Sequence, residues 1–178
     1  MDGVRLRTGT AEDAGDIART VALAFERYRE IAPEGWAPPP VEPEPFRTRL
    51  RNRAVWCEVA EMGGEMAGHV ALIPASLHSS YPVDDPTLAQ LWQLFVREEH
   101  WGSGIATRLH DAVLEEALRR GYSEFRLYTP AAQERARGFY EREGWRSVGE
   151  AFVEPAFGGM VLIEYRRALA GQSDFSER

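Results

Sequence analysis

The chain has 178 residues, of which 44% are hydrophobic and 28% charged, a composition typical of one globular domain with its own core. No apolar run approaches the roughly 20 residues that span a bilayer, and residues 1–10 lack the apolar core of a signal peptide. We therefore expect a cytoplasmic protein without a membrane partner. The formal net charge of −7, from 28 acidic and 21 basic residues, argues against nucleic acid as a partner and favours a cationic ligand such as an amine.

Two residue types exclude several kinds of chemistry. The only cysteine is Cys57, so neither an intrachain disulfide nor a multi-cysteine metal site can form. Its place in a strand-like run predicts a buried small hydrophobe and not a nucleophile. Every basic residue is Arg, which excludes a P-loop lysine and a lysine Schiff base. No His, Asp and Glu residues show metal-ligand spacing, so no metal is predicted.

The first third of the chain predicts a strand, a helix and a loop. Alternating strand-like and helix-like segments indicate an α/β domain built on a sheet. A short strand is expected at Val4–Arg7, and Thr10–Asp13 has the pattern of a capping box that opens a helix. Residues 31–45 hold six prolines, which remove backbone donors and forbid a regular helix. Too few residues precede this stretch to form a separate core, so we interpret it as a loop within one domain. A short helix is expected near Pro45–Arg53.

A hairpin and a central strand are predicted next. Ala54–Ala60 and Glu65–Pro74 flank Met62-Gly63-Gly64, which is typical of two antiparallel strands joined by a tight turn. A polar loop over Ser76–Asp85 then leads to an apolar strand at Leu88–Val96. The near-continuous apolar end of that strand indicates burial on both faces, and therefore a central position in the sheet.

The remaining segments complete the sheet. A helix with an apolar stripe is expected from the Gly-rich turn Trp101–Ala106 to about Arg120, where Gly121 ends it. The further expected elements are, in order, a strand at Glu124–Thr129, a helix at Pro130–Glu143, and strands at Trp145–Val153 and Met160–Tyr165. We thus predict one domain over residues 1–170, followed by a frayed tail over residues 171–178.

The turn Trp101–Ala106 is typical of an anion site. Glycines let the backbone turn tightly and approach a ligand closely, and the free N–H groups of the following helix point at one spot, where the helix dipole favours a phosphate. Other phosphate and catalytic motifs do not fit. Ile105 stands where a P-loop needs lysine, Thr107 stands where a dinucleotide fingerprint needs its third glycine, and Gly102-Ser103-Gly104 lacks the spacing of a hydrolase elbow.

The turn resembles the coenzyme A loop of the GNAT family of N-acetyltransferases, whose pattern is Gln/Arg-x-x-Gly-x-Gly/Ala. Here it reads Trp101-Gly102-Ser103-Gly104-Ile105-Ala106, with Trp101 in place of Gln or Arg. A second segment, from Gln133 to Trp145, is similar to the family's Asn-x-x-Ala-x-x-Phe-Tyr-x-x-x-Gly-Phe, with Gln133 for Asn and Trp145 for Phe. The order of predicted elements from Val4 to Tyr165 also agrees with that family.

The resemblance implies a fold and a cofactor. The fold is a single GNAT-like α/β (α+β) domain, with a mixed, mostly antiparallel sheet of six or seven strands flanked by helices. The implied cosubstrate is acetyl-CoA. Its pantetheine arm pairs with the backbone of a strand end that separates from its neighbour, here Leu94, Phe95 and Val96, and an N–H near Phe95 or Val96 holds the thioester oxygen. The turn binds phosphates, to which Ser103 supplies a backbone N–H and does not act as a nucleophile. Gln133 is a candidate hydrogen-bond partner of the cofactor.

The resemblance implies one catalytic residue and leaves others open. Tyr140 corresponds to the general acid that protonates the departing thiolate. The general base is not indicated, because the strand before the turn offers only Gln90 and Gln93 where many relatives carry Glu. The candidates are Glu58, His69, His78 and Glu154, beside a water chain or an amine that needs no strong base. The candidates for further phosphate contacts are Arg97 and Arg108, and those for the acceptor cleft are Tyr28, Trp36, Trp92 and the loop 154–159.

The predicted function is transfer of an acetyl group from acetyl-CoA to a primary amine of a small molecule or peptide, by direct attack in a ternary complex. Two alternatives stay open. One is an acyl-CoA-binding module that has lost catalysis, which the missing strand carboxylate favours and Tyr140 opposes. The other is a protein-modifying acetyltransferase. The resemblance also allows a homodimer.

Overall fold

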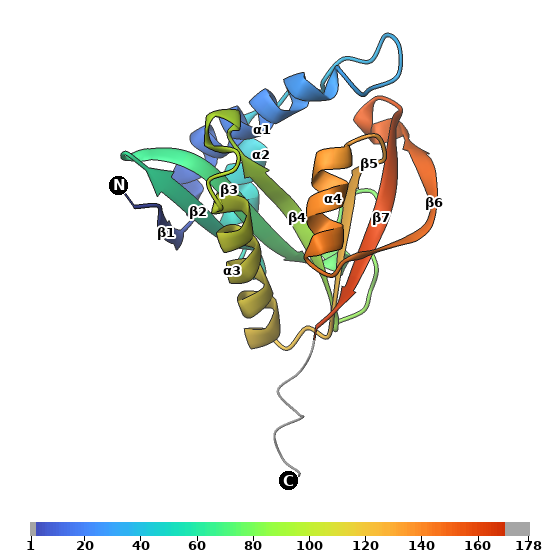
Figure 1. The fold of residues 1–178 in the computed structure, drawn as a ribbon. Helices are drawn as coiled ribbons and strands as arrows, with labels where there is room; N and C mark the ends of the chain where they lie inside the picture. The colour runs from blue at the N-terminus through green and yellow to red at the C-terminus, as the bar shows by residue number, and fades with distance from the viewer. Residues whose placement is uncertain (1–2, 170–178) are drawn as a thin grey trace.

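The computed structural model describes residues 3–169, which form one seven-stranded sheet with helices on both faces (Figure 1). The strand order is β1-β2-β3-β4-β5-β7-β6, and every neighbouring pair is antiparallel except β4 and β5. This confirms the predicted mixed, mostly antiparallel sheet. The predicted tail at residues 171–178 lies outside the described residues. The strands are β1 (Arg5–Thr8), β2 (Trp56–Met62), β3 (Glu65–Pro74), β4 (Leu88–Val96), β5 (Glu124–Pro130), β6 (Arg146–Glu154) and β7 (Met160–Ala168).

The helices cover the sheet in pairs. On one face lie α1 (Ala14–Tyr28) and α2 (Pro43–Leu50), and on the other lie α3 (Ile105–Arg119) and α4 (Glu134–Arg142) (Figure 1). The apolar stripe of α1 packs with buried side chains of β2 and β3 in one cluster. The stripe of α3 packs with side chains of β3, β4 and β5 in another. Successive strand residues point to opposite faces, so both clusters share the same strands.

Two predicted helix starts need correction. The capping box at Thr10 and Asp13 is present, but it opens a single 3₁₀ turn, and α1 begins only at Ala14. Asp13 also pairs with Arg7 at 2.7 Å, which ties this turn to β1. The helix predicted over Pro130–Glu143 begins at Glu134. Pro130 is instead the last residue of β5 and pairs with Leu162 of β7. Pairing with a distant strand thus overrides the local preference of Pro130 for the start of a helix.

The proline-rich stretch is a loop over residues 31–42, and α2 then begins at Pro43, two residues before the predicted start. Proline suits the first turn of a helix because its missing N–H would have no partner there. The loop crosses to the other end of the sheet. The Trp36 indole N–H donates to the carbonyl oxygen of Phe157 at 2.9 Å, which fastens the loop to the connection between β6 and β7.

Strand β4 is central, as predicted, but only its first half is buried. Leu88–Leu91 are buried, whereas Trp92–Val96 are half-buried. The cause is the short pairing with β5, which covers only Leu88–Gln90 of β4. Beyond Gln90 the two parallel strands separate. The predicted burial on both faces, which rested on the apolar end of the strand, is therefore wrong for that end, which lines the site described next.

Candidate functional site

A cavity of about 600 Å³ opens where β4 and β5 separate. Its walls are the second half of β4, the turn before α3, and α4, with α1 at one side. Tyr140 lines it, and so do nine of the ten residues predicted to bind a cofactor; Ser103 does not. The nine are Leu94, Phe95, Val96, Trp101, Gly102, Gly104, Ile105, Ala106 and Gln133. Segments from three regions of the sequence thus meet at one place.

The second half of β4 presents to this cavity backbone groups that do not pair with β3. Arg97 donates its backbone N–H to Ala67 across the β3 pairing at 2.8 Å, and Phe95 lies opposite His69 in the same register. Because successive residues of a strand direct their N–H and C=O groups to opposite sides, Leu94 and Val96 point theirs away from β3. The prediction named an N–H near Phe95 or Val96, and the geometry favours Val96.

The turn before α3 has a backbone that only glycine adopts easily. Gly102 and Gly104 have φ values of 79° and 84°, and a Cβ built on either would meet nothing within 4 Å. The space beside both is therefore open to a ligand. Ile105 follows, fully buried, as the first residue of α3, so the unpaired N–H groups of the first helical turn lie at the cavity wall. Glycines and helix dipole together fit an anionic group such as a phosphate.

Ser103 is used inside the turn. Its hydroxyl donates to the carbonyl oxygen of His100 at 2.6 Å, and its backbone N–H points at the same oxygen at 3.3 Å. A hydroxyl held in this way is no nucleophile, in agreement with the sequence. The predicted contact from the Ser103 backbone N–H has no support in this geometry, because that group faces back into the turn.

Tyr140 is the buried phenol of the site. Its ring, 7% exposed, lies in α4 between the rings of Phe139 and Trp145, at centroid distances of 5.5 and 5.8 Å. Burial, with a smaller contribution from the nearby Tyr28 phenol, raises the pKa of Tyr140 well above its usual value. The phenol therefore stays protonated near neutral pH and can donate a proton but not accept one.

Comparison with known proteins shows the family of the chain. The model of the acetyltransferase (GNAT) family matches residues 21–145. The chain belongs to this family. The prediction from the two motifs is thereby confirmed, and the matched range runs from α1 through the turn to the end of the second motif.

Among sequence relatives of this GNAT protein are N-acetyltransferase 8 of Mus musculus and N-acetyltransferase 8B of Homo sapiens. The first is 38% identical over 109 residues, which are 59% of this chain and 44% of the relative. The second is 40% identical over 98 residues, which are 53% of this chain and 40% of the relative. The aligned part thus spans less than half the length of either relative.

Solved structures share the fold at low sequence identity. YncA of Salmonella typhimurium, solved with acetyl-CoA, has a TM-score of 0.76 at 15% identity and covers 96% of both chains. The ribosomal-protein-alanine N-acetyltransferase of Brucella melitensis has a TM-score of 0.72 at 20% identity and covers 93% of this chain and 99% of its own. Within residues 3–169 of this GNAT domain, no helix has both the length and the apolar character to cross a membrane.

Of the four candidate bases, the two carboxylates lie outside the cavity lining. Glu58 is half-buried on β2, and its pKa is raised by burial and by Glu116 of α3. Glu154 is buried at the end of β6, where it accepts a hydrogen bond from the Ala156 N–H at 2.8 Å. Glu154 therefore caps its own turn.

The two candidate histidines are also absent from the lining. His69 is fully buried behind Gln93, with its Nε2 2.8 Å from the Gln93 Oε1. Burial lowers the pKa of His69 to about 4. His78 accepts the backbone N–H groups of Ser80 and Tyr81 at its Nδ1, and burial and Arg126 lower its pKa to about 4. Both rings are neutral near pH 7, but neither contacts the space in which an amine would react.

The two arginines predicted to meet phosphates are engaged elsewhere. The Arg97 Nε donates to the Thr20 hydroxyl at 3.2 Å, and Arg108 donates to the Val4 carbonyl oxygen at 2.8 Å. Neither lines the cavity. The guanidinium groups at the cavity wall come instead from Arg27 of α1 and from Arg135 and Arg142 of α4. Sequence reasoning missed these three, although the second motif contains Arg135 and Arg142.

The predicted acceptor residues divide into two groups. Tyr28 and Trp92 line the cavity, together with Tyr128, which sequence reasoning missed. Trp36 does not line it. Its ring packs edge-on against Phe157 at 5.6 Å, and the Phe157 ring also lies 4.9 Å from that of Phe25. These contacts join the 154–159 loop to α1 and the proline loop, so Trp36 acts as a support of the cavity and not as part of its wall.

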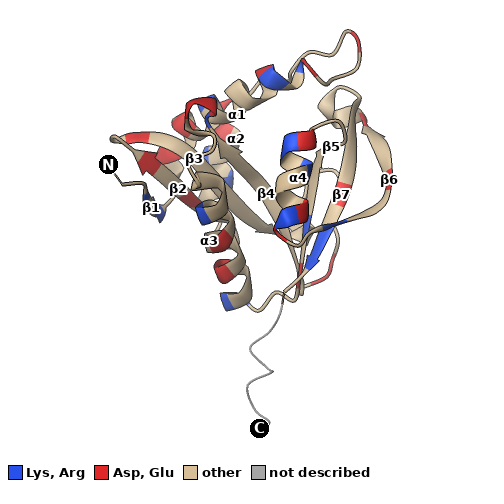
Figure 2. Ribbon diagram, viewed as in Figure 1, with Lys and Arg blue, Asp and Glu red and all other residues tan. Residues whose placement is uncertain are grey.

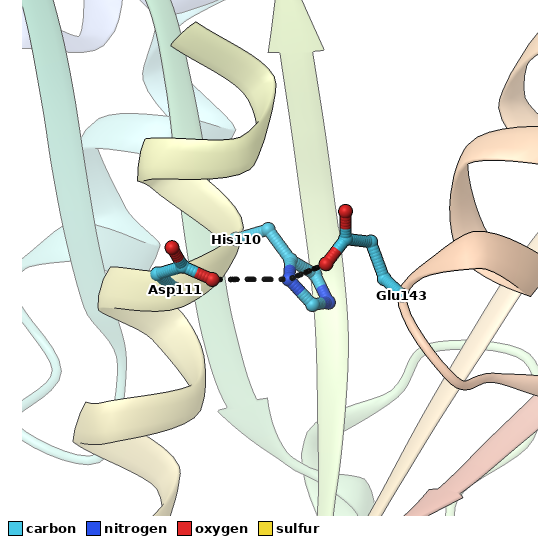
Figure 3. Close-up of side chains that lie close together, drawn as sticks. All are labelled: His110, Asp111 and Glu143. Atoms are coloured by element: carbon cyan, nitrogen blue, oxygen red, sulfur yellow. Dashed lines mark ion pairs between the residues drawn. The ribbon is translucent and has the colours of Figure 1, made fainter. Parts of the chain in front are cut away.

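One cluster of possible metal ligands lies outside the cavity lining. Figure 3 shows the buried His110 of α3 with its Nδ1 3.6 Å from Glu143 and 3.9 Å from Asp111. However, the Trp145 indole N–H donates to His110 Nε2 at 2.9 Å. The neutral ring must then carry its proton on Nδ1, the atom that faces the carboxylates. This donor set does not fit a cation, and the hydrogen bond between Trp145 and His110 instead joins α3 to the segment that follows α4.

Proposed function

We propose that this GNAT domain transfers an acetyl group from acetyl-CoA to a primary amine by direct attack within a ternary complex. The observation that carries the proposal is the meeting of three features at one cavity: the free backbone edge of β4, the glycine turn before α3, and the buried phenol of Tyr140. The solved YncA, which shares the fold, binds acetyl-CoA. The relatives named N-acetyltransferase support the reaction class.

The residues present fit the cofactor. The turn at Gly102 and Gly104 offers open space and free N–H groups for phosphates, and the backbone N–H and C=O of Leu94, which point away from β3, offer partners for the amide groups of a pantetheine arm. Acetyl-CoA supplies the acyl thioester. The Val96 N–H donates to the carbonyl oxygen of that thioester, where negative charge develops as the amine attacks. Gln133, at the cavity wall, donates a further hydrogen bond to the bound cofactor.

Tyr140 completes the reaction. The amine nitrogen attacks the carbonyl carbon, the carbon–sulfur bond breaks, and Tyr140 gives its proton to the departing thiolate. Because the pKa of the phenol lies above neutral pH, Tyr140 carries this proton when the thiolate departs. The nitrogen then loses its surplus proton, which returns through water to the Tyr140 phenolate. The four predicted bases do not line the cavity, so we propose that the amine loses its proton to water. The aromatic wall of Tyr28, Trp92 and Tyr128 suits an ammonium group before that loss.

The acceptor is a primary amine of a small molecule or of a peptide. Solved structures with this fold include enzymes of both kinds, among them a phosphinothricin N-acetyltransferase and the ribosomal-protein-S18-alanine N-acetyltransferase of Escherichia coli. The aromatic groups at the cavity wall can contact either acceptor through its ammonium group. A panel of both kinds of amine is therefore the appropriate screen.

The test begins with calorimetric titration of the protein with acetyl-CoA, with NADH and ATP as controls. If the protein binds acetyl-CoA but neither NADH nor ATP, turnover is then measured with the amine panel in a thiol-release assay. Tyr140→Phe should lower turnover with the best acceptor by about 100-fold while leaving the affinity for acetyl-CoA unchanged. Tyr122→Phe is the control, because it removes a phenol hydroxyl from a half-buried residue that does not line the cavity.

Each outcome has a distinct meaning. Absence of acetyl-CoA binding would contradict the proposed function as a whole. Binding without turnover on any amine would favour the alternative of an acyl-CoA-binding module. Unchanged turnover in Tyr140→Phe would show that another group protonates the thiolate.

A further inference from the structure

Trp101 links two arginines at the wall of the cavity. Its side chain is 38% exposed, and its indole N–H donates to the Val96 carbonyl oxygen at 2.9 Å, which fixes the ring over the end of β4. The guanidinium carbon of Arg135, from α4, lies 4.2 Å from the ring centroid, and that of Arg27, from α1, lies at 5.7 Å. All three residues line the cavity. Two helices and the turn therefore meet at one indole.

The turn itself lacks positive charge. Residues 98–106 contain two glutamates, Glu98 and Glu99, and no arginine, and the segment between β4 and α3 is correspondingly red in Figure 2. The chain as a whole carries −7. Backbone N–H groups and a helix dipole provide only partial charges. A ligand with several phosphates would therefore meet net negative charge unless a cation reached the turn from another element.

Arg135 is the cation best placed for this, because of the three arginines at the cavity wall only Arg27 and Arg135 lie over the Trp101 ring of the turn. Arg27 already pairs with Glu98 at 3.3 Å and with Glu30 at 3.6 Å, so its charge is largely neutralised. In the described part of the chain, no carboxylate lies within ion-pair distance of Arg135. Arg137, two residues further along α4, donates to the Tyr165 hydroxyl at 3.0 Å and to the Ala131 carbonyl oxygen at 2.9 Å. Arg135 has instead only the indole face.

We propose that Trp101 holds the Arg135 guanidinium beside the glycine turn, where Arg135 binds the phosphate groups of coenzyme A and sets the affinity for the phosphorylated end of the cofactor. The inference rests on the proposed function, because it needs that cofactor at this turn. A guanidinium presents paired N–H donors that match two phosphate oxygens. Stacking on a fixed ring orients the group in advance, so less freedom is lost when it binds. Arg135 is thus a specificity-determining residue supplied by α4, and Trp101 is its positioning residue.

The first experiment measures binding by calorimetry. Wild type, Arg135→Gln and Arg51→Gln are titrated with acetyl-CoA and with acetyl-dephospho-CoA, at low and at high salt. Arg51 is the matched control, because it is exposed and does not line the cavity. Arg135→Gln should bind acetyl-CoA at least about tenfold more weakly at low salt, since a hydrogen bond to a charged group is lost. The loss should shrink at high salt, which screens exposed charges, and Arg51→Gln should bind as wild type does.

The dephospho compound identifies the phosphate concerned. If Arg135→Gln weakens both compounds equally, Arg135 binds the diphosphate. If it weakens only acetyl-CoA, Arg135 binds the terminal phosphomonoester. Both results support the inference. Equal affinity of wild type and Arg135→Gln for acetyl-CoA would overturn it while leaving the proposed function intact. Absence of binding to wild type would overturn the proposed function and this inference with it.

The second experiment tests the part of Trp101. Trp101→Leu should weaken acetyl-CoA binding, and the same change in the Arg135→Gln background should weaken it much less, because the two residues act as one unit. Additive losses would show that Trp101 does not position Arg135. Trp101→Phe retains an aromatic face and should keep most of the affinity, which separates the role of the ring from that of the indole N–H.

Discussion

Exchange of Gly104 for alanine separates the cost of backbone strain from the loss of a binding site. Gly104 and Gly64 have the same φ, 84°, and a Cβ built on either residue would meet nothing within 4 Å. Gly64 lies in the turn between β2 and β3, whereas Gly104 precedes α3 at the cavity wall. The two alanine variants therefore introduce the same local strain in different places.

The size of the effect follows from this geometry. A side chain in the left-handed region costs about 1–2 kcal/mol, which for a chain of this length lowers the melting temperature by roughly 2–8 °C. Both variants should show this shift, because neither added methyl group meets a neighbour. Only Gly104→Ala should also weaken acetyl-CoA binding, by about tenfold or more, since its methyl group and any relaxation of the turn disturb N–H groups that bind phosphate.

The assay is thermal unfolding of both variants in parallel with calorimetric titration at a temperature at which both are folded. The reasoning would be refuted if Gly104→Ala lost stability as Gly64→Ala does and yet bound acetyl-CoA as tightly as wild type. In that case the turn before α3 would not be the phosphate site. Weakened binding in both variants would instead indicate a general effect of destabilisation.

Two further predictions concern stability. Burial lowers the pKa of His110 to about 4, whereas the pKa in the unfolded chain is about 6.5. As the pH is lowered below 6.5 the unfolded chain therefore binds the proton first, and the free energy of unfolding decreases. In urea unfolding, His110→Gln should remove about 2 kcal/mol of the loss of stability between pH 7 and pH 5, and an unchanged pH dependence would contradict this. A Cβ on Gly68 of β3 would lie 2.6 Å from the Phe95 carbonyl oxygen of β4, so Gly68→Ala should lower both the melting temperature and the affinity for acetyl-CoA. As a control, Gly15→Ala adds a methyl group to open space on α1 and should stabilise the protein by about 0.5–1 kcal/mol. An unchanged melting temperature in Gly68→Ala would show that β3 and β4 can move apart freely.

Local signals in the sequence predicted most of the fold and the position of the site. The glycine turn and the 3.6-residue stripe of α3 are short-range patterns, and the structure has both where they were expected. The failures lie where distant segments decide. Pro130 was assigned to a helix by its local preference, but pairing with Leu162 makes it the end of β5. The end of β4 was predicted to be buried, but its neighbour β5 separates from it.

The candidate site was predicted less completely, because long side chains take partners that are remote in the sequence. Arg97 and Arg108 flank the turn and were expected to face it, yet they donate to Thr20 and Val4, 77 and 104 residues away. The arginine that faces Trp101 most closely, Arg135, belongs to another helix. Similarly, Glu154 was a candidate base by residue type alone, and its burial in a cap became evident only in three dimensions.

The strand order also bears on how the protein folds during its synthesis. One side of the β4–β5 boundary is built from residues 5–119 and the other from residues 124–168, so the boundary in space is also a boundary in the chain. Chains emerge from the ribosome N-terminus first, and short-range antiparallel pairs form sooner than distant ones. The four strands β1 to β4 can therefore associate before β5 has been synthesised. Until β5 and α4 arrive, the apolar face of α3 that will cover Phe125 and Trp145 has only part of its partners. The binding cavity can close only after β5 and α4 have joined the sheet, and a nascent chain halted before β5 would leave exposed the surface of β4 and α3 that lines it.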